Sequence, residues 1–219
     1  MKIKKKILFG ILGLVIVLVT IFYKPTLNYL IGQVSHPKGF IGYVLTKIWN
    51  KTFDNMTNWG LENIDIKDTD HILDVGSGGG ETIYKLANQT PFGKVYGIDI
   101  SSEAVKSSLE RNKKWLEQNR VEILEADVAV LPFEDNAFDK ITAIQTHMYW
   151  DNLEGGFSEI HRVLKSDGIF LLICEKDKIE YHMNKYKTND EMKELLKSIG
   201  YSNIAVRENG NWIEFVCQK

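Results

Sequence analysis

Residues 71–80 carry the stretch HILDVGSGGG, which decides the fold. Its first five residues form a short apolar run that predicts a β-strand, and a helix is expected over residues 81–88. The glycines between them allow the backbone to turn sharply and let its N–H groups come close to a ligand. A strand, a glycine turn and a helix in this order are typical of a doubly wound α/β sheet, where ligands bind at the carboxyl ends of the strands.

Strands and helices alternate along the chain that follows. This alternation predicts a mostly parallel sheet with right-handed crossover connections. Near the end, the pair Asn209-Gly210 lies between two short runs and signals a β-hairpin, so the last strand is expected to be antiparallel. Further strands are expected at residues 94–100, 121–126, 140–145, 168–174, 203–207 and 212–218, and helices at residues 101–119, 153–164 and 189–199.

Charge divides the chain into two parts. Residues 1–53 contain eight lysines and neither Asp nor Glu, whereas residues 54–219 hold the other 19 basic side chains and all 29 acidic ones. The second part therefore has a formal net charge of −10. Because binding a nucleic-acid phosphate backbone requires a basic surface and this part of the chain is acidic, we expect no nucleic-acid partner.

An uncharged run, ILFGILGLVIVLVTIFY, occupies residues 7–23 between a cluster of four lysines and Lys24. As a helix, these residues would span about 25 Å, slightly less than the roughly 30 Å hydrocarbon core, and the flanking lysines can reach outward to cover the difference. A cleaved secretory signal would end in a small-x-small site, which the run lacks. We therefore expect residues 1–25 to form an uncleaved transmembrane anchor.

Two further parts are expected after the anchor. Residues 26–60 carry apolar side chains at helical spacing and predict a helical linker or lid, while residues 61–219 form the main domain. The connection at residues 175–188 is long, and we expect it to cover a substrate together with residues 37–59. Because equal numbers of lysines lie on both sides of the apolar run, the positive-inside rule does not fix its orientation.

The glycine turn has a competing interpretation as a dinucleotide-binding motif. That motif requires G-x-G-x-x-G, but its third glycine position is occupied by Glu81. Glu81 at the start of the helix and Asp74 just before the turn would both repel a pyrophosphate. The two carboxylates favour a ligand with a cationic part and no phosphate, and an NAD-type oxidoreductase remains the alternative.

Aspartates follow three successive strands. Besides Asp74, Asp99 ends the second predicted strand and Asp127 follows the third. A carboxylate at the position of Asp99 can accept two hydrogen bonds from a ribose diol, and Ile100 beside it can lie against a flat base. Asp127 can receive an exocyclic amine. Together the three acids predict a nucleoside-binding site at one edge of the sheet.

Four segments resemble the class I S-adenosylmethionine-dependent methyltransferases, especially the bacterial small-molecule group. They are ILDVGSGGGE (residues 72–81), VYGIDIS (95–101), EADVAVLPFEDNAFD (125–139) and EIHRVLKSDGIFLL (159–172). The resemblance covers roughly residues 64–218 and implies a Rossmann-like sheet of seven strands whose last strand is antiparallel. One departure is KSDG at residues 165–168, where the family usually has KPGG, in a turn far from the cofactor.

The resemblance also implies how S-adenosylmethionine is bound. Asp74 and the backbone of residues 76–78 would hold the methionine end, Asp99 would accept the ribose hydroxyls, and Ile100 would pack on the adenine. The next strand ends would supply contacts to the adenine amine and to the sulfonium. The implied cofactor-binding residues are Asp74, Gly76, Ser77, Gly78, Asp99, Ile100, Asp127, Val128 and Gln145.

The segment after Gln145 is expected at the mouth of the site. His147 is the best candidate for a general base, although a packing role is more common for a histidine. Tyr149 is the second candidate for a catalytic residue. Tyr149 and Trp150 are also expected to wall the substrate pocket or to face a cation, and a plain hydrophobic cap is the alternative. Methyl transfer from a sulfonium is an in-line displacement, which requires a base only when the acceptor is protonated.

The expected acceptor is a small molecule or a lipid-like compound, and the anchor makes the membrane a second partner. Because S-adenosylmethionine is made in the cytosol, the domain is expected to face the cytoplasm. No metal is expected, since no two histidines or cysteines have ligand spacing. Cys174 and Cys217 are expected in the core. A cofactor-binding scaffold without turnover is a further alternative.

Overall fold

The computed structural model describes residues 38–219. The predicted anchor and the first part of the predicted linker lie outside the described residues. Within residues 38–219, no helix combines the length and the apolar character needed to cross a bilayer. The domain boundaries expected near residues 25 and 60 stay predictions.

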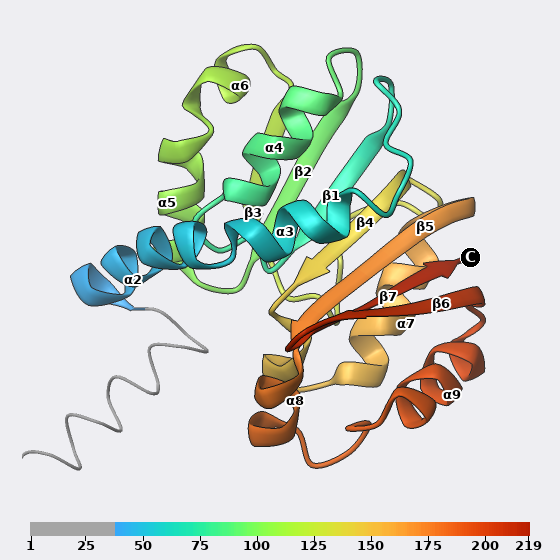
Figure 1. Ribbon diagram of the computed structural model, residues 1–219. Helices are drawn as coiled ribbons and strands as arrows, with labels where there is room; N and C mark the ends of the chain where they lie inside the picture. Colours follow the sequence, from blue (N-terminus) through green and yellow to red (C-terminus); the bar gives the residue numbers. More distant parts are fainter. Residues whose placement is uncertain (1–37) are drawn as a thin grey trace, which may run out of the picture.

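A seven-stranded sheet forms the centre of the molecule, in the order β3-β2-β1-β4-β5-β7-β6 (Figure 1). β1 pairs in parallel with both β2 and β4, so the strand order reverses beside β1. In a doubly wound sheet, such a reversal opens a crevice at the carboxyl ends of the strands. The strands are β1 (His71–Val75), β2 (Lys94–Asp99), β3 (Val121–Glu125), β4 (Phe138–Ile144), β5 (Leu164–Glu175), β6 (Ser202–Asn209) and β7 (Trp212–Gln218).

The last two strands confirm the expected antiparallel hairpin. β7 pairs antiparallel with both β5 and β6. The turn between β6 and β7 contains Gly210 at φ +58°, a conformation that glycine adopts without steric cost. The largest difference from the expected boundaries is at β5, which begins at Leu164 because this residue already pairs with Phe138 of β4.

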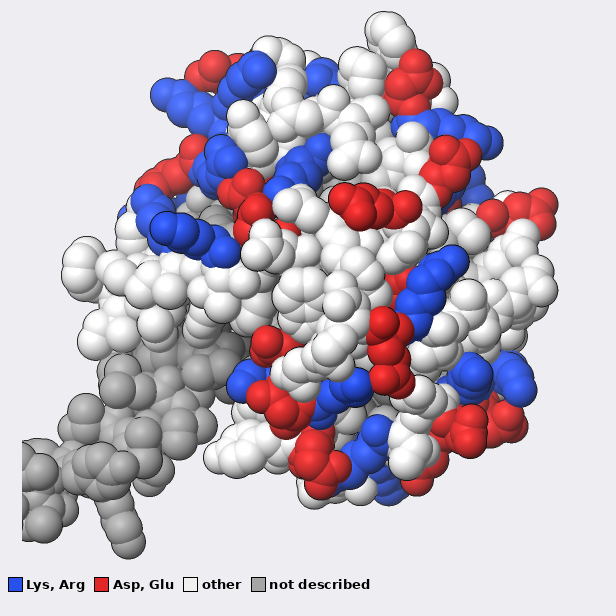
Figure 2. Space-filling view, in the orientation of Figure 1, with Lys and Arg blue, Asp and Glu red and all other residues white. Residues whose placement is uncertain are grey.

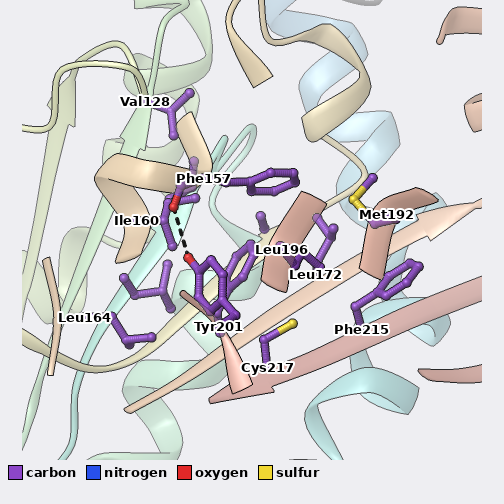
Figure 3. Packing of buried hydrophobic residues seen from close by; sticks show 14 of the residues in the cluster. Val128, Phe157, Ile160, Leu164, Leu172, Met192, Leu196, Tyr201, Phe215 and Cys217 are labelled. Carbon is purple, nitrogen blue, oxygen red and sulfur yellow. Dashed lines mark hydrogen bonds between the residues drawn. The ribbon is translucent and has the colours of Figure 1, made fainter. Parts of the chain in front are cut away.

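Helices cover both faces of the sheet (Figure 1). On one face lie α3 (Asp54–Leu61), α4 (Glu81–Gln89), α5 (Ser102–Arg111) and α6 (Lys113–Glu117), and on the other lie α7 (Leu153–Val163) and α9 (Asn189–Ile199). The side chains of β5 point alternately to the two faces of the sheet. Leu171 and Ile173 pack in the first layer, under α3 to α6, and Leu172 packs in the second layer, under α7 and α9. In the second layer, the Tyr201 hydroxyl donates a hydrogen bond to the Phe157 carbonyl at 3.1 Å (Figure 3).

Two segments differ from the sequence-based expectation. One long helix is expected at residues 101–119, but α5 and α6 are separated at Asn112. The Asn112 side-chain amide donates to the Gly80 carbonyl at 2.9 Å and to the Ser108 carbonyl at 3.0 Å, so it supports the turn after β1. The connection after β5 is not only a loop, because it contains α8 (Lys176–His182).

An N-terminal helix, α2 (Gly39–Thr52), lies across α5. Its Gly39 N–H donates to the Glu103 carboxylate at 2.7 Å, and its Tyr43 hydroxyl donates to the Glu110 carboxylate. α2 continues through Phe53 into α3. These two helices therefore run from the rim of the sheet onto its face, past the carboxyl end of β1 (Figure 1).

Candidate active site

A pocket opens where the strand order reverses, at the carboxyl ends of β1, β2 and β4. It is bounded by the turn after β1, the ends of the neighbouring strands, and α2 and α3. The structure brings all nine predicted cofactor-binding residues to this pocket. They are Asp74, Gly76, Ser77, Gly78, Asp99, Ile100, Asp127, Val128 and Gln145.

The turn after β1 depends on its glycines. Gly76 has φ +71°, and a Cβ at this position would lie 2.2 Å from Oγ1 of Thr146, so a larger residue would clash with the end of β4. Gly78 has φ +51°, and a Cβ there would have no heavy atom within 4 Å among the described residues. Gly76 thus allows close packing against Thr146, and Gly78 leaves the pocket side of the turn open.

Asp99 links the glycine turn to the end of β2. One carboxylate oxygen accepts the Gly78 N–H and the other accepts the Ser101 N–H, both at 2.9 Å. These charge-assisted bonds hold the carboxylate at a fixed position on the pocket wall. Because each carboxylate oxygen can accept a second hydrogen bond, Asp99 can also receive the hydroxyls of a ribose.

Asp74 is buried at the end of β1, with 2% of its surface exposed. Oδ1 accepts a hydrogen bond from the Thr142 hydroxyl at 2.7 Å, whereas no donor among the described residues reaches Oδ2. The pKa of this carboxyl is raised to about 7: burial is the largest cause, the Thr142 hydrogen bond lowers the pKa, and the Asp99 charge adds to the rise. A cationic group in the pocket would satisfy Oδ2 and stabilise the ionised form.

The residues after β2 and β3 line a flatter part of the pocket. Ile100 has 52% of its surface exposed, which leaves its apolar side chain available to a planar ring. The Asp127 carboxylate accepts the Ala129 N–H at 2.9 Å and thereby fixes the loop that follows β3. Val128 is buried beside it. This pairing of an apolar surface with a carboxylate suits an adenine that has an exocyclic amine.

Gln145 directly follows β4 and has a left-handed conformation, with φ +57°. Its side-chain amide donates to the Glu175 carboxylate at 2.6 Å and accepts the Glu175 N–H at 2.9 Å. Gln145 therefore connects the ends of β4 and β5. Sequence reasoning identified Gln145 as a pocket residue but not Glu175, because a contact between two strand ends 30 residues apart has no local sequence signal.

His147 does not reach the pocket, contrary to the expectation of a general base. It begins the 3-10 helix η1 (His147–Tyr149), has 2% of its surface exposed and packs against Trp150 and Phe157. No hydrogen-bond partner reaches either ring nitrogen among the described residues. Burial lowers its pKa to about 4, so the ring stays neutral. This placement assigns His147 to the hydrophobic core.

Tyr149 lines the pocket beside Trp150, as expected for a wall of the substrate site. Burial, with smaller contributions from the neighbouring Cys174 and Glu175, raises the pKa of its phenol to about 12. The hydroxyl therefore stays protonated at neutral pH and can donate a hydrogen bond. Its placement fits a pocket wall rather than a base.

The N-terminal helices contribute four pocket residues that were not singled out individually from the sequence. Thr46 and Trp49 of α2, Phe53 between the helices and Thr57 of α3 all line the pocket. The apolar residues at helical spacing indicated a lid over residues 37–59, but the spacing alone did not show which helix face turns inward. Residues 175–188, also expected to cover the site, are absent from the described lining of this pocket.

Comparisons with known proteins agree with this geometry. Residues 73–172 match a family model described as a methyltransferase domain. The chain is similar to a sterol 24-C-methyltransferase of Gibberella zeae, at 36% identity over 49% of this chain and 28% of that protein. It is also similar to the 2-phytyl-1,4-naphtoquinone methyltransferase of Nostoc punctiforme, at 36% identity over 42% of this chain and 41% of that protein.

A solved structure of a SAM-dependent methyltransferase from Aquifex aeolicus has the same fold, with a TM-score of 0.63 and 25% identity over 74% of this chain and 88% of that one. The chain spans less than half the length of the two curated relatives above. Residues 73–172 are therefore similar to a methyltransferase domain, and the comparisons support S-adenosylmethionine as the cofactor of this pocket. The fold is that of the class I enzymes.

Proposed function

We propose that this protein transfers a methyl group from S-adenosylmethionine to a lipid-like small molecule. The observation that carries the proposal is the convergence of Asp74, Asp99 and Asp127 around an open glycine turn in one pocket. S-adenosylmethionine has a cationic methionine end, a ribose diol and an adenine, and the three carboxylates suit these three parts in turn. Asp74 would hold the ammonium group, Asp99 the ribose and Asp127 the adenine amine.

The competing oxidoreductase interpretation receives no such support. At the first residue of α4, the Glu81 carboxylate pairs with the Arg111 guanidinium at 2.8 Å. This helix start therefore holds a carboxylate where a dinucleotide-binding protein would place a pyrophosphate. Because this ion pair neutralises the charge of Arg111, the guanidinium is not available to bind a phosphate either.

The chain's own residues contribute alignment and exclusion of water to the transfer. S-adenosylmethionine would supply an electrophilic methyl group to the acceptor, and the sulfur of the cofactor would keep the electron pair of the broken carbon–sulfur bond. Trp49, Phe53, Tyr149 and Trp150 form an aromatic wall that removes water from an acceptor approaching in line. An acceptor that is already nucleophilic at neutral pH needs no base from the protein.

The aromatic wall also supports an apolar acceptor. Two relatives are named for methylation of a sterol and of a phytyl naphthoquinone, both of which are lipids. The apolar run at residues 7–23 supports a membrane location, with the domain on the cytoplasmic side where the cofactor is made. Protease treatment of intact cells tests this orientation: the domain should survive until the cells are lysed, and digestion in intact cells would contradict it.

The binding of S-adenosylmethionine is expected to weaken below pH 7 because of Asp74. Burial raises the pKa of this carboxyl to about 7, and the cofactor's ammonium group favours the ionised form, so binding at lower pH releases a proton. The association constant should fall by up to about tenfold per pH unit below pH 7 and level off above it. Calorimetry in buffers of different ionisation enthalpy measures both the affinity and the proton release.

Asp74→Asn is the matched variant for this pH dependence. Its amide cannot ionise, so its affinity for the cofactor should be lower and nearly independent of pH between about 5.5 and 7.5. The fold should remain intact because Thr142 can still donate to the amide oxygen. If the wild-type affinity were also independent of pH over this range, another residue would have to bind the ammonium group.

Methyl transfer itself is tested with the full-length chain, S-adenosylmethionine tritiated at the methyl group, and a lipid extract. At a cofactor concentration below the wild-type Kd, radiolabel is expected in the organic phase with the wild type and at least about tenfold less of it with Asp99→Ala. Mass spectrometry of the labelled fraction would then identify the acceptor. Radiolabel confined to water-soluble compounds, with cofactor binding intact in calorimetry, would overturn the lipid-like acceptor.

A further inference from the structure

The outer side of α2 presents an unusual apolar surface. Phe40, Ile41, Val44 and Ile48 have 79%, 42%, 37% and 53% of their surfaces exposed. These are four of the nine exposed large hydrophobic residues in residues 38–219, gathered on a single helix of 14 residues. In Figure 2 the uncharged patch lies at the left of the molecule, where Figure 1 shows α2. Contiguous apolar surface of this kind marks an interaction site.

The inner side of the same helix faces the cofactor pocket. Gly42 and Thr46 are buried, and Thr46 and Trp49 line the pocket. At about 100° per residue, these three residues lie on the side of the helix opposite the exposed apolar residues. One helix thus forms the pocket wall on one side and an exposed apolar face on the other. Whatever binds the outer face lies next to the pocket rim.

The charges around the outer face favour an anionic surface beyond it. Lys47 and Lys51 lie on this side of α2 and are exposed. The acidic residues beside α2 are engaged: Glu110 of α5 accepts the Tyr43 hydroxyl and pairs with Lys47 at 3.6 Å, and Asp54 of α3 pairs with Lys85 at 2.7 Å. An amphipathic helix with apolar residues flanked by lysines is typical of helices that lie in the interface of a lipid bilayer.

The chain that precedes α2 favours a bilayer as the occupant. It ends at Lys38, directly before α2, and contains the uncharged run at residues 7–23. If that run spans a membrane, the 15 residues from Lys24 to Lys38 limit the distance of α2 from the bilayer to about 50 Å even when fully extended. A membrane surface is then permanently within reach of the exposed face.

We propose that α2 lies in the interface of the bilayer, with Phe40, Ile41, Val44 and Ile48 among the lipids. The pocket rim formed by the other side of α2 then opens at the membrane surface, where an acceptor dissolved in the bilayer can enter without crossing water. The statement about the acceptor rests on the proposed function, whereas the docking of α2 does not.

The test uses the full-length chain in vesicles of phosphatidylcholine and phosphatidylglycerol. A cysteine introduced by Ile48→Cys is labelled with an environment-sensitive dye, and a lipid with a nitroxide near its headgroup serves as the quencher. Labelling is selective because the native Cys174 and Cys217 are 1% and 0% exposed. Phe92→Cys is the matched control, since Phe92 is also apolar and 78% exposed but lies at the opposite end of the sheet, before β2.

Quenching at position 48 should be at least about fivefold stronger than at position 92, because interfacial helices bury their apolar face among the headgroups. Equal, weak quenching at both positions would overturn the proposal. Dye at position 48 that is shielded from water but not quenched by the lipid would also overturn it. That result would show that protein covers the face, either residues 1–37 or a second copy of the chain.

Docking and activity can fail separately. If lipid quenches the dye at position 48 but no tritium enters the lipid fraction, the docking stands and the acceptor assignment falls. If tritium enters the lipid fraction and position 48 is not quenched, the docking falls. The double variant Phe40→Ser with Val44→Ser, labelled at Ile48→Cys, should keep its affinity for S-adenosylmethionine within about twofold, since neither substituted side chain lines the pocket, and should lose the quenching at position 48.

Discussion

The Asp99→Ala variant is expected to bind S-adenosylmethionine at least tenfold more weakly than the wild type, a loss of about 1.4 kcal/mol or more. The substitution removes the proposed acceptor of the ribose hydroxyls. It also removes the acceptor of the Gly78 and Ser101 N–H groups, which fix the turn and the end of β2. Calorimetric titration with S-adenosylmethionine measures the effect.

Asp135→Ala is the control for this experiment. Asp135 pairs with Arg162 at 2.8 Å, but its side chain is 68% exposed and it does not line the pocket. Its removal should change the affinity by less than about twofold. Melting curves of both variants separate loss of binding from loss of fold. Equal affinities of Asp99→Ala and the wild type would exclude the ribose contact assigned to this carboxylate.

The largest effect on stability is expected for Phe157→Ala, at about 3–5 kcal/mol. Phe157 is fully buried between α7 and the sheet (Figure 3). Its ring centroid lies 5.3 Å from that of Trp150 and 5.9 Å from that of Phe170. Truncation leaves a cavity that the strands behind it cannot collapse to fill. Urea denaturation followed by circular dichroism measures the change in the free energy of unfolding.

Phe92→Ala is the matched substitution at the surface. Because Phe92 is 78% exposed, its loss should change the free energy of unfolding by less than about 0.5 kcal/mol. A loss below about 1 kcal/mol for Phe157→Ala would mean that the α7 side of the core is more loosely packed than the structure indicates.

The sheet and the cofactor side of the pocket could be predicted because their signals are local. The turn after β1 needs glycines at Gly76 and Gly78, and the aspartates follow directly on short apolar strands. Parallel strands place their carboxyl ends at one edge, so residues far apart in sequence meet there without further information. The Asn209-Gly210 pair likewise fixes the hairpin through its own backbone preference.

The acceptor side could not be predicted in the same detail because it depends on packing between distant segments. His147 follows β4 in the sequence at the mouth of the pocket, but η1 turns its ring into the core against Phe157. Trp49 appeared only as part of an amphipathic stretch, since the side of α2 that turns inward is decided by its contacts with α5. The break of the helix at Asn112 depends on the carbonyl of Gly80, 32 residues away.

The most direct test of the central claim is a crystal structure of this chain soaked with S-adenosylmethionine. The cofactor is expected in the pocket beside the glycine turn, with the ribose hydroxyls within hydrogen-bonding distance of the Asp99 carboxylate and the ammonium group at Oδ2 of Asp74. A soaked crystal whose pocket holds no cofactor, or a bound cofactor whose ribose lies away from Asp99, would contradict it.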